Sequence, residues 1–100
     1  MPEGNKTVPR NADELLFYVR DSFPNAVASA PWVSLPTKSG QGFVGYGVML
    51  TYNNVSIFCT LGAPLFFVVV RSQPVGEFSY DPNEVKQGLD RFAQEVRKAG

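Results

Sequence analysis

Two consecutive asparagines, Asn53 and Asn54, place the strongest constraint on what this chain can fold into. Asparagine tolerates the left-handed backbone conformation that a two-residue hairpin turn requires. On either side lie the segments 43–52 and 55–61, both rich in β-branched, aromatic and other apolar residues. The sequence therefore predicts an antiparallel hairpin whose register is fixed by its turn.

The predicted register sorts the side chains of the hairpin onto two faces. One face is entirely apolar or aromatic and pairs Tyr52 with Val55, Leu50 with Ile57, Val48 with Cys59, and Tyr46 with Leu61. The other face pairs Thr51 with Ser56, Met49 with Phe58, and Gly47 with Thr60. Because turn chemistry and hydrophobic pattern agree, a slipped register is disfavoured.

An amphipathic helix is predicted at each end of the chain. Asn11 is a suitable N-cap for the first, with Glu14 three residues later as the second half of a capping box, and Pro24 ends it. Asp81 and Glu84 provide the same signals for the second, with a proline in its first turn.

Further strands are predicted between the helices. The segment 25–37 has strand-forming residues, but Pro31 and Pro36 each remove a backbone donor, which favours an edge strand or an extended connector. Residues 65–71 begin with six consecutive apolar residues, a pattern typical of a central strand covered on both faces. Residues 75–80 fit one more short strand.

Together these elements predict a two-layer α+β sandwich. It consists of an antiparallel meander of three to five strands, flanked by an N-terminal and a C-terminal helix in the order α-β-β-β-β-α. Residues 1–10 lack periodicity and are predicted to be a flexible tail, with residues 11–100 forming a single domain.

Composition argues against several classes of function. Nine basic and nine acidic residues balance, so the chain lacks the positive charge that nucleic-acid binding requires. Without histidine, and with Cys59 as its one cysteine, it has no zinc-ligand set and no internal disulfide. No acidic residue lies between Asp21 and Glu77, which leaves little for general acid–base catalysis. We therefore expect no enzymatic activity, no cofactor and no metal.

The compartment is also predicted from what the sequence lacks. The start of the chain has no apolar segment of the kind found in secretory signals. The longest apolar run, residues 65–70, is too short to insert into a membrane. We expect a cytoplasmic protein.

Two motifs suggest chemistry that their context does not support. Residues 40–45 match the G-x-G-x-x-G fingerprint of dinucleotide-binding folds, but a strand follows where that fold needs a helix. We interpret these glycines as relieving crowding, at a bulge or beneath a large side chain such as Trp32. Cys59 is a nucleophile in principle, but the hairpin register places it on the core face, which favours a buried structural cysteine.

The glycine-rich loop 37–47 also contains a candidate anion site. The side chains of Thr37, Lys38 and Ser39 and the backbone amides of Gly40 and Gly42 could form a concave nest for a phosphate or carboxylate.

The sheet has more apolar side chains than two helices on one face can cover. If the helices cover the face of Tyr46, Leu50 and Ile57, several large residues remain on the other face. The predicted partner interface consists of Phe43, Met49, Phe58, Phe66, Phe67 and Trp32. Contiguous apolar patches of this kind mark interaction sites. In the other interpretation, the Trp32 segment or the first helix folds over this face.

These observations predict a non-enzymatic protein-binding module, such as a small adaptor, inhibitor, immunity-type protein or chaperone. It would dock through its sheet, as a homodimer or onto a larger protein. The alternative is a domain that binds a small ligand or anion in the loop 37–47.

Overall fold

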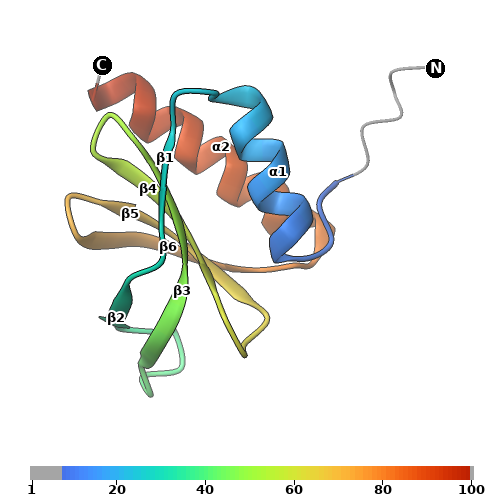
Figure 1. Cartoon of the computed structure of the whole chain (residues 1–100). Coiled ribbons are helices and arrows are strands. Elements are labelled where there is room, and N and C mark those ends of the chain that lie inside the picture. The colour runs from blue at the N-terminus through green and yellow to red at the C-terminus, as the bar shows by residue number, and fades with distance from the viewer. Residues whose placement is uncertain (1–7, 100) are drawn as a thin grey trace.

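The computed structural model describes residues 8–99 (Figure 1). Its elements are, in chain order, α1 (Ala12–Ser22), β1 (Val27–Ser29), β2 (Trp32–Leu35), β3 (Phe43–Tyr52), β4 (Val55–Thr60), β5 (Leu65–Val70), β6 (Gln73–Ser79) and α2 (Pro82–Ala99). All strand pairs are antiparallel, in the order β1-β3-β4-β5-β6, with β2 also pairing with β3. This is the predicted α+β class in the predicted helix–sheet–helix order. The sheet has six strands rather than at most five, because the segment 25–37 supplies two short ones.

The central hairpin has the predicted turn and register. Asn53 and Asn54 both adopt left-handed φ values, of 53° and 65°. Tyr52 pairs with Val55, and the pairing continues without a slip to Gly47 opposite Thr60. A second turn with two left-handed residues, Arg71 and Ser72, joins β5 to β6. The sequence does not signal it, because neither residue type favours that conformation.

Both helices begin at the predicted caps. The Asn11 side chain accepts a hydrogen bond from the Glu14 amide at 3.0 Å, and Glu14 in turn accepts one from the Arg10 amide at 3.0 Å. At α2, Asp81 accepts a hydrogen bond from the Asn83 amide at 3.1 Å. These side chains satisfy amide groups that have no partner within the helix.

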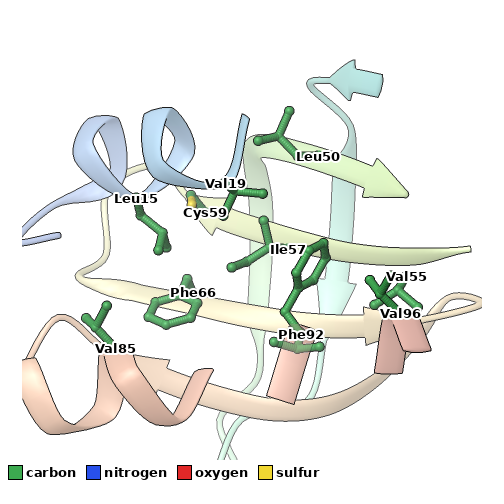
Figure 2. Close-up of a cluster of buried hydrophobic side chains, with 11 residues drawn as sticks. Leu15, Val19, Leu50, Val55, Ile57, Cys59, Phe66, Val85, Phe92 and Val96 are labelled. Carbon is green, nitrogen blue, oxygen red and sulfur yellow. The ribbon is translucent and has the colours of Figure 1, made fainter. Parts of the chain in front are cut away.

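Both helices pack on one face of the sheet, which we call the helix-side face. Figure 2 shows Leu15 and Val19 of α1 and Phe92 of α2 directed toward the strands. This main core consists of Leu15, Val19, Leu50, Val55, Ile57, Cys59, Phe66, Val68, Val85, Phe92 and Val96. Burial of these apolar side chains is the dominant stabilising contribution to the layer arrangement.

Strands β4 and β5 are covered on both faces. Every residue of β4 is buried, as are Phe66, Phe67, Val68 and Val69 of β5. The absence of alternation in this apolar run therefore has the predicted cause, a central position in the sheet.

The predicted tail lies largely outside the described residues, which begin at Val8. Within the described part, Val8 packs against the main core and Pro9 is buried.

The glycines of β3 make room for aromatic rings. A Cβ atom on Gly47 would overlap the carbonyl oxygen of Cys59 and the ring of Phe58. A Cβ atom on Gly45 would lie 3.1 Å from the ring tip of Phe43. Within the 40–45 motif the predicted crowding is therefore confirmed for Gly45 alone. A Cβ atom on Gly40 would meet nothing within 4 Å, and both Gly40 and Gly42 have left-handed φ values, of 85° and 79°, that favour glycine. Gly47 lies outside the motif, and the ring over it belongs to Phe58, whereas Trp32 is exposed.

We predict that Gly47→Ala lowers the free energy of unfolding by about 1–3 kcal/mol, because the new methyl group overpacks against backbone and a buried ring. Gly45→Ala is the matched control and should cost clearly less, because the Phe43 ring tip can shift. Urea denaturation of both variants measures the difference. An equal loss of stability in both variants would contradict the prediction, because it would mean that the new methyl group is accommodated equally well at the two positions.

Candidate functional site

The face of the sheet away from the helices, the second face, is already covered within one chain. Phe58 and Phe67 have no exposed surface. They form a second apolar cluster with Leu35 and Val69, and the rings of Phe58 and Phe67 lie 6.5 Å apart. These side chains are buried although neither helix lies on this face of the sheet.

Curling of the sheet provides the cover. Strands β2 and β6 stand at opposite ends of the strand order, about 19 Å apart in a flat sheet with β3, β4 and β5 between them. Yet the loop after β2 contacts β6, where the Lys38 amide donates a hydrogen bond of 2.6 Å to the Glu77 carboxylate. Leu35, at the end of β2, belongs to the cluster on the second face. The edge strand β2 and its loop therefore fold over that face. This agrees with the second interpretation of the sequence, in which the Trp32 segment covers the second face.

The predicted partner interface needs correction for this reason. Phe58 and Phe67 lie inside the second cluster, and Phe66 lies in the main core beneath the helices. None of these three side chains has surface to offer a partner in this structure. Phe43 and Met49 are half-buried at the margin of the second cluster.

Trp32, the sixth predicted interface residue, is 59% exposed, and it belongs to a different surface. Four large side chains lie there, with 55% to 62% of each exposed: Trp32, Val44, Tyr46 and Leu61. We call this surface the β2–β3 patch.

The members of the patch are neighbours across the strands. Trp32 pairs with Tyr46, and their rings meet edge to face with centroids 4.7 Å apart. The Leu61 amide donates a hydrogen bond of 3.0 Å to the Tyr46 carbonyl oxygen. Val44 lies two residues before Tyr46 and so shares its face.

The patch is the part of the helix-side face that the helices do not reach. Tyr46 points to the same side as Leu50, which is buried beneath the helices. Figure 1 shows β2 and the paired end of β3 running away from both helices. The sequence placed Tyr46 under the helices. The lengths of the elements could have indicated that Tyr46 stays exposed. An 11-residue helix spans about 16 Å and a 10-residue strand about 33 Å, so α1 cannot cover the whole of β3.

The predicted anion site forms a compact turn, but its polar groups bond to one another. The Gly40 amide donates to the Thr37 carbonyl at 3.0 Å, and the Gly42 amide donates to the Thr37 hydroxyl at 3.1 Å. The Thr37 and Ser39 hydroxyls lie 2.9 Å apart. The Lys38 amide already holds the Glu77 carboxylate.

The carboxylate of Glu77 lies beside this loop. An open hollow of about 300 Å³ is lined by both Lys38 and Glu77. The carboxylate offsets the attraction of Lys38 for an external anion. These contacts favour a structural role for the loop, which is tethered to β6, over the predicted role as a phosphate site.

Cys59 lies in the main core, as its register predicted. Burial raises the pKa of its thiol from 9.0 to about 11, which is opposite to the shift a nucleophile needs. Burial raises the pKa of the Tyr80 hydroxyl as well. That hydroxyl is buried beside the Cys59 thiol.

No group of three or more acidic or cysteine side chains within residues 8–99 is arranged to hold a metal ion. Neither helix in this range is long and apolar enough to cross a membrane. Comparisons of the chain with protein families, curated proteins and solved structures found no match.

We predict that Glu77→Ala loosens the loop 36–42. Loss of a hydrogen bond to a charged acceptor should speed hydrogen exchange of the Lys38 amide about tenfold. Glu77→Gln, which keeps an acceptor oxygen without the charge, should fall between the variant and the native protein. An unchanged exchange rate in Glu77→Ala would contradict the proposed tether.

We predict an alkaline loss of stability from the buried thiol. The unfolded chain releases the Cys59 proton near pH 9, whereas the folded chain keeps it until about pH 11. The stabilisation is therefore complete below pH 9 and decreases by about 2–3 kcal/mol as the pH rises to 11. Urea denaturation between these pH values measures it. Cys59→Ala should flatten the dependence, and Tyr80→Phe should remove the part contributed by the phenol. A Cys59→Ala slope equal to that of the native protein would contradict the assignment.

Proposed function

We propose that this protein is a non-enzymatic protein-binding module that docks through the β2–β3 patch. The observation that carries the proposal is the exposure of Trp32 and Tyr46 in one contiguous apolar surface. Tryptophan and tyrosine are enriched among the residues that dominate binding energy at protein interfaces.

The size and charge of the patch also support the proposal. Its four side chains expose roughly 400–500 Å², within the range of the largest patch on a typical monomer, which is often functional. Between Asp21 and Glu77 the only charged side chains are Lys38 and Arg71, and neither belongs to the patch. Depletion of charge is typical of the buried centre of an interface.

At least four of the eight carboxylates within residues 8–99 have structural roles, which supports the non-enzymatic part of the proposal. The Glu14 carboxylate accepts a hydrogen bond from the Arg10 amide at the start of α1, and the Asp81 carboxylate caps α2. Glu77 holds the loop amide, and Glu95 lies 2.9 Å from Arg91 in an ion pair. These groups have structural partners, and they do not converge on one cavity as an acid–base pair would.

We predict that a photo-crosslinking amino acid at position 61 captures a partner that the same amino acid at position 17 does not. Leu61 lies in the patch, whereas Phe17 is 75% exposed on α1 and serves as the matched control. Mass spectrometry of crosslinks formed in cells that express the chain identifies the captured protein.

A second change tests whether the patch itself binds. Trp32→Ser should remove the position-61 crosslink while the thermal unfolding midpoint shifts little, because the side chain is mostly exposed. Equal capture at positions 61 and 17, or capture that survives Trp32→Ser, would overturn the proposal.

A further inference from the structure

The strand beside the patch is a longer sheet edge than its two short elements suggest. Ser29 pairs with Met49, and Trp32 pairs with Tyr46. Ala30 and Pro31 therefore stand opposite two residues of β3, with no residue inserted on either strand. Residues 27–35 form one edge strand with a constant register, interrupted only in its hydrogen bonding.

Hydrogen-bond alternation shows which peptide groups of this edge are free. The Gly47 amide donates to the Pro31 carbonyl at 3.4 Å, so Pro31 is a residue that bonds toward β3. In an antiparallel ladder every second residue does so, and the residues between direct their N–H and C=O groups outward. The outward residues are Ala28, Ala30, Trp32 and Ser34, and all four are exposed.

This edge lacks the features that usually prevent strands from joining. Such features are charged side chains, bulges, covering loops and prolines that remove an outward donor. The edge has no charged residue and no bulge. The N–H group that Pro31 lacks would have pointed at β3, so this proline removes nothing from the free side.

The opposite edge is protected. Strand β6 contains Pro74 and Glu77, and its pairing with β5 shifts at Val68 and Val69. The Lys38 loop also covers part of it. A strand from a partner is therefore expected to pair with the β1–β2 edge rather than with β6.

We infer that the β1–β2 edge joins the same edge of a second copy of this chain, as antiparallel strands about a two-fold axis. The inference rests on the proposed function and names its partner. An uncharged edge beside an uncharged patch needs an uncharged counterpart, and a second copy of the same surface meets that condition. A two-fold pairing uses up both bare edges, so it closes at two copies.

One register satisfies every outward peptide group. It sets Ala30 opposite Trp32 of the second copy and Ala28 opposite Ser34 of the second copy, so each indole lies beside a methyl group. A two-fold axis perpendicular to the sheet keeps the helix-side faces together. The two β2–β3 patches then adjoin on one continuous face.

The test is the mass of the chain in solution together with hydrogen exchange. Light scattering and sedimentation should give a concentration-dependent mass that approaches twice the 11.0 kDa of the chain. Amides of Ala28, Ala30, Trp32 and Ser34 should become more protected from exchange as concentration rises.

Variants locate the interface. Ser34→Pro removes an outward donor without touching the bonds to β3, and Ala30→Lys places a charge on the free edge. Each should raise the dimer dissociation constant at least tenfold. Gln73→Lys, on the β6 edge, is the control and should leave it unchanged. Circular dichroism confirms that each variant is folded.

Two results would overturn the inference: a monomer at all concentrations up to about 1 mM, or a dimer that both edge variants leave intact. The crosslinking experiment separates this failure from that of the proposed function. A monomer that still captures a different protein at position 61 retains the function with another partner. A monomer with no position-specific capture loses both.

Discussion

Burial of β4 and β5 on both faces is the constraint on which the rest of the structure depends. Apolar side chains such as Ile57 and Phe58 alternate along β4 and need cover on opposite sides of the sheet. The two helices cover one side. Residues 8–99 contain no third helix for the other side, and the sheet curls until Leu35 and the loop after it lie against the second face. A twisted sheet can curl in this way, because strand rotation accumulates across several strands.

The same curl determines which surface stays open. As β2 and the paired end of β3 bend over the second face, they move away from the helices on the other side (Figure 1). Trp32 and Tyr46 are left facing solvent there. The excess of apolar side chains that the composition indicates is therefore real, but it emerges on the helix-side face. The curl that covers the second face thus leaves the end of the helix-side face, around Trp32 and Tyr46, exposed.

The glycine-rich loop illustrates how a ligand-like motif can serve the fold. Its hydroxyls and amides bond to one another, and the Lys38 amide binds a carboxylate from β6. Glu77 is distant in sequence, yet it occupies the position where an external anion would meet the loop. The tether holds the two curled ends of the sheet together over Phe67.

The sequence by itself determined the central register and much of the local structure, but not the Arg71–Ser72 turn. The Asn53–Asn54 turn, the Asn11 and Asp81 caps and the apolar run of β5 each depend on neighbouring residues, so they could be predicted. Only the tertiary structure decided which apolar side chains stay exposed. Tyr46 and Phe58 are both large residues in strands, but their fates depend on the curl of the whole sheet and on the reach of α1. Those two properties come from many long-range contacts added together, and no local pattern records them.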